Sequence, residues 1–400
     1  MEYIESISGA EEIGITLVRA PEEGIAAALI GIGRPGLRVE AVFAMTVSAE
    51  AARISVVEGK RARRVTASEP LLALVRESRA RSARSVAGPW WRMSMRIDEF
   101  ALVETEYDYG EEPFPGDQLF RPEAYRDDIA AYPRPRLPVW LAAYIGHADR
   151  QSRGRRSAAL AARADRLHGV RQRLLGEGFP ELPRLWARWA ALAAAHVAVG
   201  SEDGPRIVPD TGWYEAARNA SSGSSLYVLP GGRAVLSGGV WNAPPLNAAY
   251  NGGIELPNLY AGAPDWVTNA ALNPRAAVGL LSFCYWWDGE RWYRGESPSV
   301  RQCGAALPPI WSAGSVLETI VRLLSAQPSL AQRAGVARLM SAVERGAVGA
   351  ASLVAAFGSD ADIDGAYRQF ASAGLVPAEV AGSAEVPVDG NGSRRNGPLG

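Results

Sequence analysis

Apolar and polar residues alternate between residues 91 and 107, and this pattern predicts a β-hairpin. A loop at 98–100 would pair Trp91 with Tyr107, Met93 with Thr105 and Met95 with Val103, and the other face would pair Arg92 with Glu106 and Ser94 with Glu104. In this register Trp91 and Tyr107 are expected to lie in the core. The apolar positions at period two are Trp91, Met93, Met95, Ile97, Ala101, Val103, Thr105 and Tyr107.

Other patterns predict helices and strands around this hairpin. Short apolar runs at 39–44 and 54–56 indicate strands around a Gly33–Gly36 turn. A helix is expected over 68–81, with Ser68 as its N-cap. Further helices are expected over 122–131, opened by Pro122, and from Pro138 onward.

The second half of the chain has its own pattern. Residues 150–198 are rich in arginine and alanine, with apolar residues at helical spacing. Hairpins are predicted around Pro230–Gly232 and around Asp288-Gly289, the stronger turn signal. Apolar stripes then predict helices between residues 314 and 377.

These elements predict an α+β fold, with antiparallel sheets and packed helices in two domains. The expected divisions are a first α+β domain, a helical linker, a second α+β domain rich in Gly, Asn and aromatic residues, a helical C-terminal segment, and a disordered tail. Their limits are 1–148, 149–199, 200–325, 326–376 and 377–400.

Charge and hydropathy restrict the class of protein. The formal net charge is -1, so no global field favours nucleic acid or an anionic membrane. The most apolar helical stretch, 189–199, is about half the roughly 20 residues that a membrane span needs. The first residues are acidic and show no secretory signal. We therefore expect a soluble cytoplasmic protein without membrane or direct nucleic-acid partners.

The residues that usually carry catalysis or metal binding show no recognisable spacing. Cys284 and Cys303 lack a CxxC arrangement and are expected to be free thiols. The three histidines are far apart in the sequence, and no HExxH or nucleotide-binding glycine motif is present. No catalytic residue, cofactor or metal site is therefore predicted. The histidines are His147, His168 and His196.

An acidic stretch follows the first predicted strand of the hairpin and is the main candidate site. Residues 104, 106 and 108 would place three carboxylates on one strand face. The stretch is open to several interpretations: a solvated surface, a face for a basic partner, or a metal or acid–base site. Trp90 and Phe114 are the aromatic residues expected to be exposed as apolar anchors. The acidic residues are Glu104, Glu106, Asp108, Glu111, Glu112 and Asp117.

The second half offers two further sets of candidates. Four aromatic residues near the Asp288-Gly289 turn could form a stacking platform or simple cross-strand packing: Trp286, Trp287, Trp292 and Tyr293. A set of polar residues could line a pocket: Asp210, Tyr214, Asn219, Asn242, Asn247, Asn251 and Glu255.

Residues 71–144 resemble a known family. A Leu-Leu-Ala-Leu-Val-Arg-Glu-Ser helix leads into Gly-Pro-Trp-Trp-Arg-Met-Ser-Met, then Glu-Tyr-Asp-Tyr-Gly-Glu-Glu-Pro-Phe, Ala-Tyr-Arg-Asp-Asp-Ile, Tyr-Pro-Arg and Pro-Val-Trp-Leu. This order resembles actinobacterial relatives of the YezG-type immunity proteins, which are small cytoplasmic α+β proteins that neutralise polymorphic toxins. The resemblance implies inhibition by direct binding, without catalysis. The second half has no such counterpart.

The leading hypothesis is therefore an immunity protein that binds a co-encoded toxin. A basic nuclease is one class of toxin that would fit. An acidic face would provide steering toward such a partner. Two other hypotheses stay open: an enzyme of unrecognised type with a pocket in the second domain, and a structural or scaffolding protein.

Overall fold

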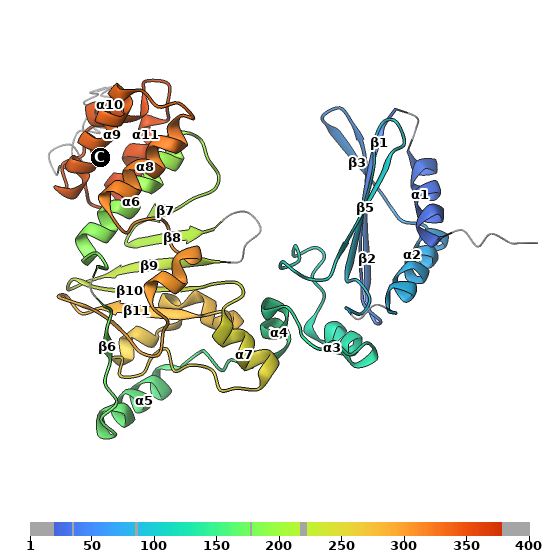
Figure 1. Ribbon diagram of the computed structural model, residues 1–400, viewed down its shortest axis with the longest axis horizontal. Coiled ribbons are helices and arrows are strands. Elements are labelled where there is room, and N and C mark those ends of the chain that lie inside the picture. The colour runs from blue at the N-terminus through green and yellow to red at the C-terminus, as the bar shows by residue number, and fades with distance from the viewer. Residues whose placement is uncertain (1–19, 34–35, 85–86, 177, 217–221, 378–400) are drawn as a thin grey trace, which may run out of the picture. The chain divides into compact units, whose positions relative to one another are not determined.

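The computed structural model describes residues 20–33, 36–84, 87–176, 178–216 and 222–377. The chain divides into two compact units, residues 1–138 and 139–400. Each unit contains an antiparallel sheet with packed helices, so the predicted α+β class is confirmed (Figure 1). The predicted tail at 377–400 lies, except for its first residue, outside the described residues.

The first unit is a five-stranded sheet in the order β3-β2-β1-β4-β5, with β3 and β5 at its edges. Helices α1 and α2 pack side by side on one face of this sheet (Figure 1). The elements are α1 (Pro21–Ile32), β1 (Arg38–Met45), β2 (Glu50–Glu58), β3 (Arg61–Val65), α2 (Glu69–Ser82), β4 (Arg92–Ile97), β5 (Val103–Asp108) and α3 (Pro122–Ala131).

Alternation along the strands fills the core beneath α1 and α2. Val39, Ala41 and Phe43 of β1 point to the same side as Met93 and Met95 of β4, and all are buried. The helix at 69–82 begins after Ser68, as predicted, and α3 has the predicted bounds. Helix α1 was not predicted. The Gly33–Gly36 segment therefore follows a helix, and the turn between β1 and β2 lies at 46–49.

The predicted hairpin register is wrong by two residues. Tyr107 pairs with Met93, Thr105 with Met95 and Val103 with Ile97. The loop spans five residues, because the Asp98 carboxylate accepts hydrogen bonds from the backbone N–H groups of Phe100 (2.9 Å) and Leu102 (2.8 Å). Ala101 within it has a left-handed backbone, with φ of 63°. A shift of two residues keeps the side chains of β4 and β5 on their predicted faces.

The second unit is built on a seven-stranded antiparallel sheet, in the order β6-β12-β11-β10-β9-β8-β7. Its strands are β6 (Arg173–Leu174), β7 (Arg206–Val208), β8 (Thr211–Glu215), β9 (Gly223–Leu229), β10 (Arg233–Gly239), β11 (Phe283–Trp287) and β12 (Trp292–Arg294). Its helices are α4 (Val139–Gly146), α5 (Arg155–Leu167), α6 (Leu182–Ala198), α7 (Pro244–Gly252), α8 (Ala313–Leu324), α9 (Leu330–Glu344), α10 (Ala350–Phe357) and α11 (Ile363–Ser372).

Both faces of this second sheet are buried at its centre. Leu236 and Tyr285 face α6 and the helices α8–α11, whereas Val235 and Trp286 face a layer of short 3₁₀ turns between residues 265 and 278. This explains the continuous apolar run before Asp288, because a strand covered on both faces does not alternate. Trp287 packs against Trp292 across the strands at 5.5 Å, so these aromatic rings form core packing and no exposed platform.

The segment expected to be a helical linker contributes to the core of the second unit. Helix α6 is buried along almost its whole length, and its alanines allow close approach of α8, α9 and α11. Helix α4 lies in the second unit, where Val139 packs with Ala243 and Leu246.

Candidate functional site

The acidic residues of the first unit lie on edge strand β5 and in the segment after it. Glu104, Glu106 and Asp108 share the sheet face opposite α1 and α2, since their strand partners Arg96, Ser94 and Arg92 alternate with the buried methionines. Glu111 and Glu112 follow directly and are exposed. The structure therefore brings five of the six predicted acids together along one edge and its continuation.

Arginine side chains neutralise part of this charge. Asp108 forms an ion pair with Arg92 at 2.7 Å, and Asp117 forms one with Arg53 at 2.9 Å. Glu106 accepts only a long hydrogen bond of 3.4 Å from the Ser94 hydroxyl. Four of the six predicted acids project to solvent without an ion pair to any described residue. We call these four the acidic edge: Glu104, Glu106, Glu111 and Glu112.

The two predicted apolar anchors are buried, so this part of the site prediction is wrong. Trp90 is fully buried in the core beneath α1 and α2. Phe114 is 5% exposed and packs edge-on against Trp91 at 6.4 Å. Both were expected at the surface because they lie outside the alternating strand positions, but Trp90 packs into the core and Phe114 packs against Trp91 and Tyr125.

Exposed apolar side chains lie instead at the tip of the β4–β5 hairpin. Phe100 is 79% exposed and Leu102 is 68% exposed, and Val103 beside them is partly exposed. Tyr107, predicted to be in the core, is also 41% exposed on edge strand β5, although its ring contacts Trp90 and its hydroxyl donates to Glu22 of α1 at 3.3 Å. The five-residue loop, which a simple alternation count does not reveal, produces this tip.

A buried carboxylate organises the opposite end of the hairpin. Asp128 of α3 is fully buried and accepts two hydrogen bonds from Arg79, at 2.7 and 2.8 Å. It also accepts from the Trp91 indole at 2.9 Å and from the Val47 backbone at 3.0 Å. Arg134 stacks on the Trp91 ring, with 3.6 Å between guanidinium carbon and ring centre, and burial lowers its pKa to about 10. The Asp128 carboxylate and the Arg79 guanidinium satisfy each other, as a buried charge requires, and with Trp91 and Arg134 they form a structural centre.

The polar residues predicted to form a pocket in the second unit are dispersed. Asp210 lies in the exposed turn between β7 and β8, whereas Asn247 and Asn251 bond to each other within α7. Tyr214 lies on β8, and Asn242 is exposed before α7. Asn219 is outside the described residues. Glu255 of this set lines a cavity.

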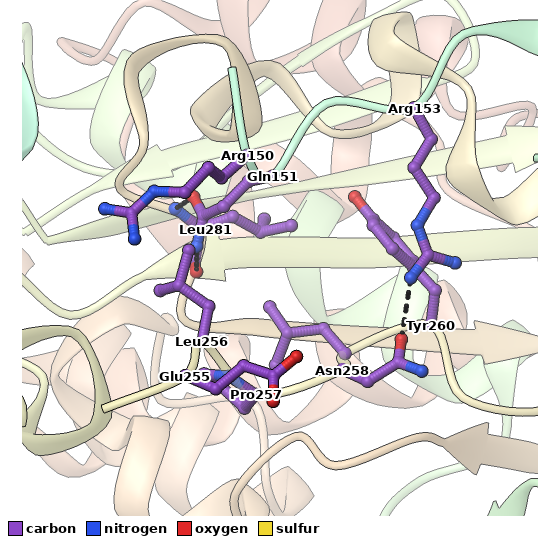
Figure 2. Close-up of a pocket in the computed structure, with 10 residues that line it drawn as sticks. Arg150, Gln151, Arg153, Glu255, Leu256, Pro257, Asn258, Tyr260 and Leu281 are labelled. Atoms are coloured by element: carbon purple, nitrogen blue, oxygen red, sulfur yellow. Dashed lines mark hydrogen bonds between the residues drawn. The ribbon is translucent and has the colours of Figure 1, made fainter. Parts of the chain in front are cut away.

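That cavity, of about 320 Å³, is lined by Arg150, Gln151, Arg153, residues 255–260 and Leu281 (Figure 2). The Gln151 side chain forms its base by donating to the Leu281 carbonyl at 2.7 Å and accepting from the Leu281 N–H at 2.9 Å. Arg153 donates to the Asn258 side-chain oxygen at 2.9 Å and lies over the Tyr260 ring. Sequence reasoning missed Gln151, Arg153 and Asn258, which are brought together only by folding.

The remaining titratable groups show no reactive arrangement. Burial raises the pKa of Cys303 to about 11, and it raises that of Cys284 further, so both thiols stay protonated near neutral pH. Among the described residues, no cluster of three or more His, Cys, Asp or Glu side chains could hold a metal ion. Within the same residues, no helix has the length and apolar character of a membrane span.

Comparison of the chain with models of known protein families and with curated protein sequences gives no match in either case. The resemblance to YezG-type immunity proteins therefore rests on the residues of segment 71–144 alone. In the structure this segment supplies α2, β4, β5, α3 and most of α4, which places the acidic edge within it.

Proposed function

We propose that the protein is an immunity protein that binds and neutralises a co-encoded bacterial toxin through the acidic edge, without catalysis of its own. The observation that carries the proposal is the exposure of Glu104, Glu106, Glu111 and Glu112 along an edge strand whose tip also exposes Phe100 and Leu102. Exposure of apolar side chains beside like charges without ion pairs is unfavourable in solvent. The same surface suits a basic partner, which would cover the apolar groups and neutralise the charges.

The partner that fits this surface is a protein with a basic face, such as a nuclease toxin. Carboxylates at the rim of an interface mainly accelerate association, and apolar side chains at its centre slow dissociation. We therefore assign the four carboxylates to steering and Phe100 with Leu102 to anchoring. The ion-paired Asp108 and Asp117 contribute little to the field that a partner meets.

The experiment is co-expression with the product of the adjacent gene, followed by kinetic measurement with the purified pair. Wild-type protein should rescue growth. The double variant Glu111→Lys/Glu112→Lys should associate on the order of tenfold more slowly at low salt, with a smaller difference at high salt. The matched control is Glu58→Lys/Glu290→Lys, which reverses two exposed acids outside the acidic edge.

Two results would count against the proposal at different levels. If the wild-type protein does not rescue the cells, the protein is not an immunity protein for that toxin. If it rescues and reversal of all four carboxylates leaves association unchanged, the toxin binds elsewhere on the protein.

A further inference from the structure

Hydrogen bonds within the chain fix the segments that line the cavity beside Gln151 and Leu281. The Asn258 backbone N–H donates to the Glu296 carboxylate at 2.6 Å, and the Glu296 N–H donates to the Asn258 carbonyl at 3.1 Å. Together with the paired Gln151 amide, these bonds fix both walls. Such a pre-formed site binds a ligand without the cost of ordering its own side chains.

The segment that carries the arginines has an unusual backbone. Ala148 and Asp149 both have left-handed conformations, with φ of 47° and 53°. Left-handed backbone is unfavourable for a non-glycine residue and persists only where the surroundings impose it. Here the Arg150 N–H and guanidinium both donate to the His147 carbonyl, at 3.0 and 3.2 Å, so the turn is fixed and delivers Arg150 and Arg153 to the cavity.

The charges that face the cavity are two guanidinium groups and one carboxylate. Arg150 donates from its Nε to the His147 carbonyl and from one terminal nitrogen to the Gly146 carbonyl. Arg153 uses one terminal nitrogen for Asn258, which leaves its remaining N–H groups for a ligand. In Figure 2, Arg153 and Asn258 lie on one side of the cavity, Arg150 lies on the other, and the Glu255 carboxylate lies between them.

We propose that this cavity binds a small zwitterion, of the class of free α-amino acids. The ligand carboxylate would pair with Arg153, and its ammonium group would pair with the exposed Glu255. A volume of about 320 Å³ is at the low end for ligand pockets, which favours a molecule of this size over a nucleotide or a cofactor. Glu255 disfavours a ligand that is only anionic. The site is independent of toxin binding.

The test uses the full-length protein alone. Each of the twenty free L-amino acids is added in a thermal-shift assay, and affinity for the most stabilising one is measured by calorimetry. We expect a rise in melting temperature that increases with amino-acid concentration, because a ligand that binds only the folded state stabilises it. No stabilisation by any of the twenty would overturn the proposal.

Two variants assign the two ends of the ligand. Glu255→Gln should weaken binding of the amino acid on the order of tenfold or more, and should not weaken binding of the same molecule without its amino group. Arg153→Gln should weaken binding of both compounds. Arg156→Gln, at an exposed position of α5 outside the cavity, is the control.

Glu255→Gln decides the case if Arg153→Gln does not fold, since Glu255 is exposed and its loss does not disturb the core. Amino-acid affinity that is the same in wild type and Glu255→Gln would overturn the zwitterion assignment.

Discussion

At the scale of single residues, the first unit depends most on Asp128. Its carboxylate joins Arg79 of α2, the Trp91 indole and the Val47 backbone, and Arg134 is 3.8 Å away. The sequence predicted a helix over 122–131, but burial of Asp128 within it could not be predicted, because its partners are 37 to 81 residues away along the chain. By contrast, burial of Trp91 could be predicted from its apolar character, although the strand begins one residue later and Trp91 does not share the face of Met93.

Replacement of Asp128 by alanine should therefore destabilise the protein strongly. The change leaves the Arg79 guanidinium buried without its anion, and breaking a buried pair in this way costs about 3–5 kcal/mol. Chemical denaturation followed by circular dichroism would measure the free energy of unfolding. The control is Asp127→Ala at the neighbouring exposed position, which should change it by much less. Equal effects of the two changes would contradict the role given to Asp128.

His196 of α6 should make stability depend on pH. Burial, with a contribution from Arg206, lowers the pKa of His196 below 6.5, so the folded state binds its proton less tightly than the unfolded state does. As the pH falls through 6.5 toward the lowered pKa, the unfolded state gains the proton first and stability decreases; below that pKa no further loss occurs.

A His196→Gln variant should lose less stability than wild type between pH 7 and 5. The comparison of the two proteins cancels the contribution of the carboxylates, which titrate in both. Parallel stability curves would show that His196 does not contribute.

At the scale of elements, periodicity and turn residues predicted most helices and hairpins, and tertiary contacts decided the rest. Helix α3 and the hairpin around Pro230–Gly232 follow their local signals. The β4–β5 register does not, because the Asp98 side chain closes a longer loop than compatible side-chain pairs suggest. The acidic residues could be identified from the sequence, whereas the ion pairs of Asp108 and Asp117 depend on tertiary contacts and the exposed tip depends on that register.

Two glycine substitutions test helix packing in opposite directions. In α9, a Cβ on Gly335 would lie 2.1 Å from the Ala355 carbonyl oxygen of α10, so Gly335→Ala should destabilise the protein despite the better helix propensity of alanine. In α8, Gly314 faces nothing closer than 3.8 Å, and Gly314→Ala should stabilise by roughly 0.5–1 kcal/mol. Thermal unfolding of both variants would measure these effects; stabilisation by both would show that α9 and α10 are not in close contact.

At the scale of the whole molecule, the division between units was expected from composition at residue 148, and the contacts place it at Pro138. The composition changes near Arg150, but the apolar helix α4 precedes that change and packs with α7. The change in composition shows where exposed segments begin. The boundary between the units depends instead on which hydrophobic core the apolar helix α4 packs against.

Fragment solubility tests this boundary. A fragment ending at Pro138 should fold and remain monomeric, since its core lies within residues 25–97. A fragment ending at Ala148 would expose Val139, Trp140 and Leu141, which are buried in the whole protein, and should aggregate. Size-exclusion chromatography with circular dichroism would compare them, and a monomeric, folded longer fragment would contradict the assignment of α4.

The hydrogen bond from the Val47 backbone to Asp128 also affects how slowly one amide proton is replaced by deuterium. Val47 lies in the turn between β1 and β2, with its side chain 47% exposed, where amides normally exchange rapidly. Its N–H, however, donates to a carboxylate that is released only when α2 and α3 separate. We therefore expect Val47 to exchange at the rate of global unfolding of the first unit, like a core strand amide. This single turn amide would then report on the integrity of the buried centre in the native protein.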